Sequence, residues 1–212
     1  MFDNIAGYKV TGFLGEGNYG KVLEAECPDG KPCAIKVEPK SASVPLLKHE
    51  ATVLLNLKNL KGVPPVYKYG QLQNYRYLIM PKLSMTLSSL MDSRTVTNGD
   101  VEVMLLHLRE IMAGIHKEGF VHRDVKPDNI MFDDTGRLYL IDFGFCTRIK
   151  KNKVEEMNRT TQGSAVGTLD FLGEKGLAGY VTKEVDYESL DRVKQYCLNK
   201  AVNTPTTTVS EL

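Results

Sequence analysis

The stretch FVHRDVKPDNIM, residues 120–131, has the composition of a loop that directs polar side chains toward one site. Asp124, Lys126 and Asn129 are spaced too irregularly to share one face of a helix or a strand. Pro127 also prevents a continuous helix, because proline has no backbone N–H and its ring clashes with the preceding turn. We therefore expect a loop whose side chains serve chemistry.

A further acidic residue follows this loop in the sequence IDFG, residues 141–144. Asp124 can accept the proton of an incoming hydroxyl group, and Lys126 can neutralise charge on a phosphoryl group during transfer. Asn129 and Asp142 offer hard oxygen ligands of the kind that Mg²⁺ takes when it bridges nucleotide phosphates. Taken singly, each motif could also be a turn in which Asp and Asn side chains bond the local backbone.

The N-terminal part of the chain has the pattern of an antiparallel sheet. Residues 8–38 alternate and turn like three strands joined by tight connections, of which PDGK (28–31) is one. YKYG (67–70) and YRYLIM (75–80) add two strands, so we expect five. Residues 44–58 between them predict a helix, because suitable residues recur every three or four positions. These residues are Leu47, Glu50, Ala51, Leu54 and Leu57.

The first hairpin of this sheet contains the glycine-rich sequence GEGNYGKV, residues 15–22. Gly15, Gly17 and Gly20 allow the backbone to close over phosphate groups, because no Cβ blocks the approach. The sequence continues as a strand, whereas a dinucleotide-binding turn would continue as a helix, and no GK[ST] follows. On these residues alone, phosphate binding and a purely structural hairpin both stay open.

Lys36, in CAIKVE, lies on the third strand and precedes Glu50 of the predicted helix. A strand lysine usually points to solvent, where a Lys–Glu pair contributes little. The functional alternative is a lysine that holds phosphate oxygens while Glu50 fixes its direction. The glycine-rich turn, this pair, HRDVKPDN and DFG occur in one order along the chain, and agreement among independent features favours the functional interpretation.

The C-terminal part of the chain has a helical pattern. Asp100 can cap a helix whose apolar residues step by four and three, and Gly119 is placed to end it. The apolar residues of this helix are Val101, Leu105, Leu108, Met112 and Ile115. The short segments IMF and LYLID then predict a pair of strands, and the tail TPTTTVSEL has the composition of a disordered segment.

Composition limits the class of protein and its partners. The chain has 212 residues, 42% hydrophobic and 25% charged, with a net charge of +1, so no overall field attracts nucleic acid or a membrane surface. One local basic stretch is most simply a solvated loop; it consists of Lys150, Lys151, Lys153 and Arg159. The four cysteines show no metal-binding spacing, and no leader or membrane-spanning segment is evident. We therefore expect a cytoplasmic location.

Together these motifs resemble a eukaryotic-type protein kinase, and more specifically the casein kinase 1 family. The resemblance rests on GEGNYGKV, FVHRDVKPDNIMF, IDFGFCTR, and VGTLDFLGEKG in place of the APE motif, which is absent, and it covers residues 8–198. It implies an α+β, bilobal fold with a reduced, mainly helical C-lobe. The implied parts are an N-lobe with the start of the hinge (1–82), a truncated C-lobe (83–198) and a polar tail (199–212).

The resemblance also implies catalytic roles. Asp124 would be the catalytic base, and Lys126 would contact the γ-phosphate of ATP. Lys36 would contact the α- and β-phosphates and pair with Glu50. The implied Mg²⁺ ligands are Asn129 and Asp142.

The same resemblance places the adenine of ATP between the lobes. Val22 and Ala34 would lie above the ring and Met131 below it, while Met80 would be the gatekeeper. The residues that would bind the cofactor are Leu14, Gly15, Gly17, Gly20, Val22, Ala34, Lys36, Met80, Pro81, Leu83 and Met131. Proline in the hinge removes one N–H, yet adenine can still be bound by the carbonyl at 81 and the N–H at 83.

The acceptor predicted from the resemblance is a serine or threonine hydroxyl of a protein, since Lys126 follows Asp124 by two positions and Thr168 follows in VGT. A small-molecule phosphotransferase of related fold and a pseudokinase that binds without turnover are the alternatives. Basic residues at 148–159 and Lys175 could favour acidic or already phosphorylated substrates, or could simply belong to a polar loop.

Loop phosphorylation is a further possibility that the sequence raises. Arg123 could receive a phosphate on Thr160, Thr161 or Ser164 and order the loop. The resemblance predicts the opposite, because casein kinase 1 relatives are generally active without it. We therefore expect activity without phosphorylation of this loop.

The segment VDYESLDRVKQYCL, residues 185–198, resembles the helix that forms the floor of the C-lobe in kinases. Asp186 would tie this helix to the backbone of the catalytic loop, HRDVKPDN (122–129). Leu190, Val193 and Cys197 fall on one stripe while polar residues lie elsewhere, so we expect a helix that is uncovered on one side. The sequence thus predicts a minimal kinase, stable and active at this length, with the shortened lobe as a possible docking place for a partner.

Overall fold

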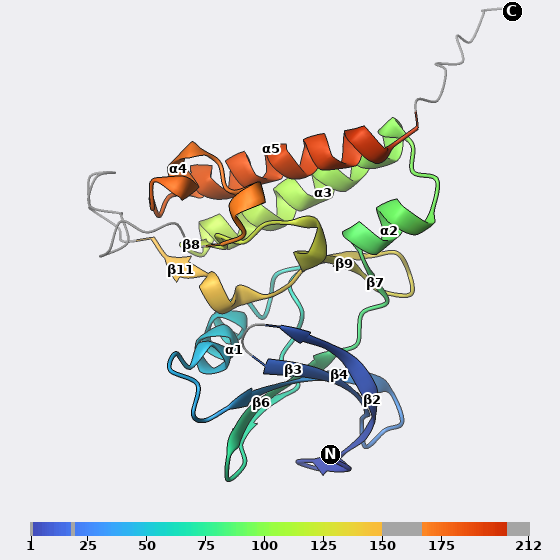
Figure 1. The fold of residues 1–212 in the computed structure, drawn as a ribbon, viewed down its shortest axis with the longest axis vertical. Coiled ribbons are helices and arrows are strands. Elements are labelled where there is room, and N and C mark those ends of the chain that lie inside the picture. Colours follow the sequence, from blue (N-terminus) through green and yellow to red (C-terminus); the bar gives the residue numbers. More distant parts are fainter. Residues whose placement is uncertain (1, 18–19, 150–166, 203–212) are drawn as a thin grey trace, which may run out of the picture.

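The computed structural model describes residues 2–17, 20–149 and 167–202, and these form two lobes (Figure 1). The first lobe is built on a curled antiparallel sheet, and the second is mainly helical. The largest hydrophobic cluster contains residues of both lobes, so the lobes share one continuous core.

The sheet of the N-lobe has six strands in the order β1-β2-β3-β4-β6-β5, and neighbouring strands are antiparallel. The strands are β1 (Asn4–Ile5), β2 (Tyr8–Gly17), β3 (Gly20–Glu26), β4 (Pro32–Pro39), β5 (Lys68–Gln71) and β6 (Tyr75–Pro81). The prediction of five strands was wrong by one. β1 was missed because two residues are too few to show an alternating pattern; the Gly7 N–H donates to Asn4 Oδ1 at 2.9 Å in the turn that follows.

Two irregularities in β2 help the sheet to curl over the space next to the second lobe. The pairing of β2 with β3 shifts between Val10 and Gly12 and again between Phe13 and Gly15, and such bulges bend a strand and increase its twist. Gly20 opens β3 with a φ of 153°, and a Cβ there would collide with the Val37 carbonyl oxygen. Only glycine therefore fits where β3 begins beneath the bent strand.

Helix α1 (Leu46–Asn56) packs against one face of this sheet. The predicted buried stripe is confirmed: Leu47, Glu50, Ala51 and Leu54 are buried, as is Leu57 just beyond the helix. Glu50 is the one carboxylate in this stripe, so the helix brings a buried acid toward the sheet.

The long helix α3 (Asn98–Lys117) forms the centre of the C-lobe, and its predicted apolar stripe is buried. Asp100 was predicted to be its N-cap, but Thr97 holds that position. The Asp100 N–H donates to Thr97 Oγ1 at 3.1 Å, and the Thr97 N–H donates to Asp100 Oδ2 at 2.9 Å. This reciprocal capping box starts the helix earlier than a lone aspartate cap would. Gly119 follows the helix end with a φ of 82°, as predicted.

The remaining helices, turns and strands complete the C-lobe. The helices are α2 (Leu87–Ser93), α4 (Glu174–Leu177) and α5 (Lys183–Lys200), with 3-10 turns η1 (Pro127–Asn129), η2 (Phe143–Phe145) and η4 (Leu169–Phe171). The strands are β7 (Met85–Thr86), β8 (Phe120–Val121), β9 (Ile130–Phe132), β10 (Leu138–Leu140) and β11 (Thr147–Arg148). β10, β9 and β7 form one small sheet, and β11 pairs with β8, so the loop between β8 and β9 is fixed at both ends.

Helix α5 runs along the outer side of α3 (Figure 1) and is amphipathic, as predicted. Its apolar stripe of Leu190, Val193 and Cys197 is buried, whereas Asp191 and Arg192 are exposed. The helix continues to Lys200, two residues past Leu198, where the predicted C-lobe ends.

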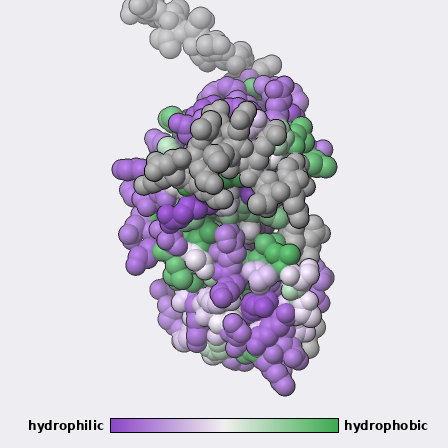
Figure 2. Space-filling view, turned by 90° about the vertical axis from the view of Figure 1, so that its left-hand side faces the viewer, coloured by the Kyte–Doolittle hydropathy of each residue, from purple (hydrophilic) through white to green (hydrophobic). Residues whose placement is uncertain are grey.

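The surface on the side of α1 and β11 is mostly hydrophilic, with apolar side chains gathered at mid-height (Figure 2). Val44 and Leu55, which are 56% and 52% exposed, lie just before and within α1. No helix in the described part of the chain is long and apolar enough to cross a membrane.

Candidate active site

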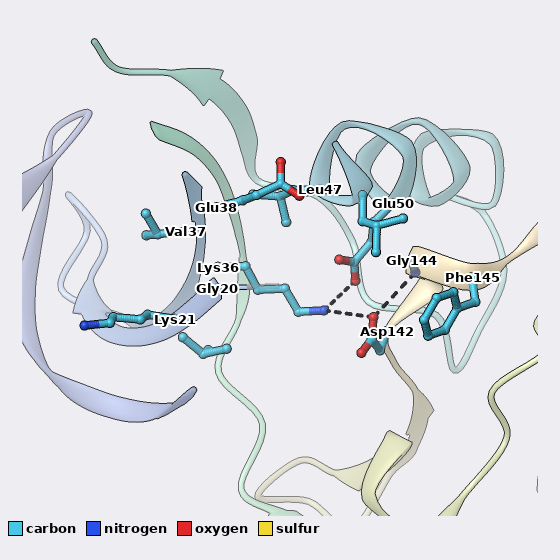
Figure 3. A pocket seen from close by; sticks show the side chains of 12 residues that line it. Gly20, Lys21, Lys36, Val37, Glu38, Leu47, Glu50, Asp142, Gly144 and Phe145 are labelled. Atoms are coloured by element: carbon cyan, nitrogen blue, oxygen red, sulfur yellow. Dashed lines mark hydrogen bonds and ion pairs between the residues drawn. The ribbon is translucent and has the colours of Figure 1, made fainter. Parts of the chain in front are cut away.

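Lys36 on β4 points away from solvent and toward two carboxylates (Figure 3). Its Nζ lies 2.6 Å from Glu50 Oε1 and 3.6 Å from Asp142 Oδ1. The side chain of Lys36 is 19% exposed and that of Glu50 is 5% exposed, so the interpretation of an exposed strand lysine is wrong. The structure instead brings together three residues that are widely separated in the sequence.

Charge stabilises this cluster against the effect of burial. Burial alone would lower the pKa of Lys36, but the carboxylates of Glu50 and Asp142 outweigh it and raise that pKa. Burial alone would raise the pKa of Asp142, and chiefly the positive charge of Lys36 lowers it instead. Lys36 and Asp142 are therefore both ionised at neutral pH.

Asp142 has the left-handed backbone conformation, with φ 63° and ψ 73°. For a non-glycine residue this conformation costs about 1–3 kcal/mol, so neighbouring contacts must hold it. Phe143 is fully buried and packs edge-on against the His122 ring at a centroid distance of 4.8 Å. His122 Nε2 lies 3.0 Å from the Ile141 carbonyl oxygen, so the residues on both sides of Asp142 are fixed to the catalytic loop.

His122 itself is buried and uncharged. Burial lowers the pKa of its ring. The Asp124 N–H donates to His122 Nδ1 at 3.3 Å, which leaves Nε2 to carry the proton and donate to the Ile141 carbonyl oxygen. This buried histidine, missed as a functional residue in the sequence, joins the catalytic loop to the segment that carries Asp142.

The backbone of the catalytic loop is held from below by Asp186 of α5. Asp186 is fully buried, and its two carboxylate oxygens accept the His122 and Arg123 N–H groups, each at 2.8 Å. His116 Nε2 on α3 lies 2.8 Å from Asp186 Oδ2. Arg123 adopts a φ of 72°, which turns the chain so that the next residue faces the site. The predicted contact of Asp186 with this loop is present.

Asp124 is 3% exposed, and four polar groups contact its carboxylate. The Thr168 N–H and Oγ1 each donate to Oδ1 at 2.8 Å. Asn129 Nδ2 donates to Oδ2 at 2.8 Å, and Lys126 Nζ lies 2.9 Å from the same oxygen. Lys126 Nζ also donates to Thr168 Oγ1 at 2.7 Å, so Thr168 links Asp124 and Lys126.

Glycine makes this contact of Thr168 possible. Gly167 has a φ of 119°, and a Cβ at this position would collide with the Arg123 carbonyl oxygen. The backbone before Thr168 can therefore pass directly over the catalytic loop. The dipeptide Gly-Thr was the only sequence signal for this contact.

The residues predicted to surround adenine lie on adjacent strands. Ala34 on β4 is directly opposite Met80 on β6, and both are buried. Val22 on β3 pairs with Lys36 and packs against the same core. Met131 lies on β9 in the other lobe.

The remaining predicted cofactor residues lie along the glycine-rich hairpin and the hinge. Leu14 is 42% exposed, Gly15 pairs with Val22, and Gly17 pairs with Gly20. Pro81 ends β6, and Leu83 lies between β6 and β7.

An ion pair next to the hinge was not predicted. Lys82 Nζ donates to Glu24 Oε1 at 2.5 Å, with both side chains 32% exposed. It links the hinge to β3 at the strand position opposite Ala34. Glu24 lies two residues after Val22, so both side chains lie on one face of the sheet.

A cavity of about 100 Å³ lies between the glycine-rich hairpin, α1 and the segment of Asp142 (Figure 3). Gly20, Lys36, Glu50 and Asp142 line it. The predicted basic and phosphorylatable positions fall outside the described residues. These positions are Lys150, Lys151, Lys153, Arg159, Thr160, Thr161 and Ser164.

Comparison with known families agrees with this geometry. Residues 8–200 match the family model described as protein kinase domain. The chain belongs to the protein kinase family. The α+β bilobal fold predicted from the sequence is therefore confirmed.

Within that family the kinase is similar to casein kinase I homologues, which confirms the predicted resemblance. It is 28% identical over 207 residues to casein kinase I homolog 3 of Schizosaccharomyces pombe, covering 92% of this chain and 47% of that protein. It is 29% identical over 201 residues to casein kinase I homolog 2 of Saccharomyces cerevisiae, covering 90% and 37%. A probable casein kinase I homolog of Encephalitozoon cuniculi is 28% identical over 178 residues, covering 81% and 56%. The chain thus spans about half, or less, of the length of these relatives.

Proposed function

We propose that this chain transfers the γ-phosphoryl group of ATP to a serine or threonine hydroxyl of a protein, with Mg²⁺ as the metal cofactor. Membership of the protein kinase family supports the general reaction. The observation that carries the specific proposal is the buried Asp124 carboxylate, held by Asn129, Lys126 and Thr168 at 2.8–2.9 Å. A carboxylate fixed in this way is already turned in one direction, and an acceptor hydroxyl that replaced one of these donors could pass its proton to it.

The residues of the site would divide the work in three parts. Asp124 would orient the acceptor hydroxyl and accept its proton, while Lys126 would balance negative charge on the phosphoryl group. Lys36 would hold phosphate oxygens of ATP, and Glu50 would keep its ammonium group in place, as their 2.6 Å contact supports. The proposed base is thus separate from the residues that would bind the nucleotide.

The donor set for a cation fits Mg²⁺. Asn129 Nδ2 is used in bonds to the Asp124 carbonyl oxygen at 2.9 Å and to its carboxylate, which leaves the amide oxygen as a possible ligand. The Asp142 carboxylate is 40% exposed and ionised. Hard oxygen donors of this kind suit Mg²⁺, which when bound neutralises phosphate charge. Asn129 and Asp142 are therefore the proposed metal ligands.

ATP fits the first lobe for similar reasons. Ala34, Met80 and Val22 give an apolar surface for adenine on adjacent strands, and the hinge offers the Pro81 carbonyl oxygen and the Leu83 N–H. The glycine-rich hairpin is closed by the pairing of Gly17 with Gly20, and the absence of Cβ atoms at these positions would let phosphates approach its backbone.

The class of protein substrate and the cellular location are two further parts of the proposal. Lys175 and the basic residues at 148–159 support an acidic or already phosphorylated protein substrate. Four free cysteines support a reducing, cytoplasmic location. Activity without loop phosphorylation, stability at this length and a partner on the C-lobe stay predictions.

A transfer assay tests the proposal directly. The purified chain is incubated with γ-labelled ATP, Mg²⁺ and an acidic protein such as dephosphorylated casein, and the labelled amino acid is identified. Asp124→Asn should lower the rate by roughly 10²–10⁴-fold, because general-base catalysis contributes about that much. Asp29→Asn, in the exposed turn between β3 and β4, is the matched control. ATP binding without transfer would indicate a pseudokinase, and transfer only to small molecules would indicate the other alternative.

A further inference from the structure

The first turn of α1 has no capping side chain of its own. Its N-cap residue is Pro45, which makes no side-chain hydrogen bond, and the first turn contains no acidic residue. N–H groups at the start of a helix need acceptors, and a proline side chain offers none. The Leu47 N–H instead donates to Glu38 Oε1 at 3.0 Å, so its acceptor comes from β4.

Glu38 is suited to this role because it is buried and paired. The residue is 2% exposed, and its second carboxylate oxygen accepts from Arg76 Nη1 at 3.0 Å. Arg76 lies directly opposite Glu38 on β6. A carboxylate buried to this extent is stable only when charges and hydrogen bonds satisfy it, and Arg76 together with the positive end of α1 does so.

Lys36 and Glu38 attach α1 to the sheet at two separate points. They are two residues apart on β4, so their side chains lie on the same face, toward α1 (Figure 3). Lys36 contacts the Glu50 side chain, and Glu38 contacts the helix backbone about one turn earlier. The spacing is about 6.6 Å along the strand and about 4.5 Å along the helix.

The contact of Glu38 with the helix backbone restricts a motion of α1 that the contact of Lys36 with Glu50 permits. A contact between two long side chains, such as Lys36 and Glu50, allows the helix to slide or rotate by small amounts. A bond to the Leu47 backbone fixes the start of the helix and hence the direction in which Glu50 projects. Lys36, Glu38, Leu47 and Glu50 all line the same cavity, so a shift of α1 changes that cavity.

We propose that Glu38 is a positioning residue, which caps α1 from the sheet and so holds Glu50 in register with Lys36. Its effect on nucleotide binding rests on the proposed function, because Lys36 is the proposed phosphate contact. Arg76 pairs with one carboxylate oxygen of Glu38 and so turns the other toward the Leu47 N–H. The sheet itself thereby sets the position of the helix that completes the phosphate site.

Two substitutions of Glu38 test the cap. Glu38→Ala removes the acceptor and should raise the KM for ATP about fivefold, the factor expected from loss of one helix-capping interaction, with kcat changed less than twofold. Glu38→Gln keeps an oxygen for the Leu47 N–H and should raise KM only about twofold. Glu26→Gln removes a carboxylate from the exposed end of β3 and should leave KM unchanged.

Two combined variants separate positioning from general stability. Pro45→Asp places a carboxylate at the N-cap, from which it can accept the Leu47 N–H, and in the Glu38→Ala background it should restore most of the lost affinity for ATP. In a Glu50→Gln background, Glu38→Ala should have little further effect on KM. A merely structural role would give the same loss in both backgrounds.

Amide hydrogen exchange measures the cap without any enzymatic activity. Exchange at the Leu47 N–H should be about fivefold faster in Glu38→Ala, and Pro45→Asp should slow it again. If Glu38→Ala does not fold, the same measurements on Glu38→Gln decide the question. Unchanged exchange and KM, multiplying effects in the Glu50→Gln background, or no rescue by Pro45→Asp would each overturn the inference. A wild-type chain that transfers no phosphate would refute the proposed function, and exchange alone would then decide the role of Glu38.

Discussion

Replacing Thr168 with valine removes one hydroxyl group and almost no volume. That hydroxyl donates to Asp124 Oδ1 at 2.8 Å and accepts from Lys126 Nζ at 2.7 Å. Hydrogen bonds to charged groups contribute about 1.5–3 kcal/mol each, but the Thr168 N–H still binds Asp124 at 2.8 Å and Lys126 keeps its contact with that carboxylate. We therefore expect the loss of about one such bond, about 2 kcal/mol, which corresponds to a roughly 30-fold lower kcat/KM for the protein substrate.

The assay is steady-state phosphoryl transfer at saturating ATP, beside urea unfolding of the same variants. Thr168→Val should lower the free energy of unfolding by about 2 kcal/mol, because the same hydrogen bond to a charged group is lost from the folded protein while Lys126 stays in contact with Asp124. Thr168→Ser keeps the hydroxyl and should stay within about threefold of the wild type. Thr135→Val removes a hydroxyl from the exposed turn between β9 and β10 and is the control. Wild-type kcat/KM in folded Thr168→Val, or an equal loss in Thr168→Ser, would show that the hydroxyl does not hold the base.

Three further predictions concern the ionisable residues Asp142, Asp186 and His122. Asp142→Asn should abolish Mg·ATP-dependent transfer in a folded protein, because an amide replaces a charged ligand poorly; full activity by the labelled-ATP assay contradicts this. Asp186→Asn should lower the free energy of unfolding by roughly 2–4 kcal/mol in urea, since a charged acceptor of two loop N–H groups is lost; a change under about 1 kcal/mol refutes it. Burial lowers the pKa of His122 in the folded state, so its contribution to stability is complete above about pH 6.5. Below that pH the unfolded chain takes up a proton that the folded chain does not, and the free energy of unfolding falls by at most about 1.4 kcal/mol per pH unit. An NMR signal of the His122 ring that titrates near pH 6.5 in the folded protein would contradict this prediction.

The sequence was sufficient where a residue type and its spacing carry the chemistry. Lys36 and Glu50 meet as the kinase resemblance implied, and Asp142 joins them from its short motif, whereas a strand pattern alone favoured an exposed Lys36. Asp124 and Asn129 lie in one loop, and the short spacing between them already required proximity. Their functional roles stay proposals.

Long-range contacts could not be predicted in the same way. Thr168 reaches Asp124 from 44 residues away, and the dipeptide Gly-Thr, the one local signal, does not say which residue it approaches. The cap of α1 is hidden for a related reason: Glu38 lies on a strand, nine residues before the Leu47 N–H that it accepts. Helix-start rules examine the residues next to the helix, and here the acceptor lies elsewhere. The helix start at Thr97 was missed for a local reason, since Asp100, three residues further on, is also a residue type that caps helices and was predicted to be the cap.

The burial of Phe143 has a consequence for inhibitors of this kinase. A compound that occupies the place of the Phe143 ring must first move a fully buried aromatic side chain out of contact with His122. Exposing such a ring costs about 1.5–3 kcal/mol, so such a compound binds roughly 10–150-fold more weakly than its own contacts would allow. Compounds that leave the Phe143 ring in place should therefore bind this chain more tightly for the same contacts. A compound that displaces the ring should associate slowly, because the ring must move first.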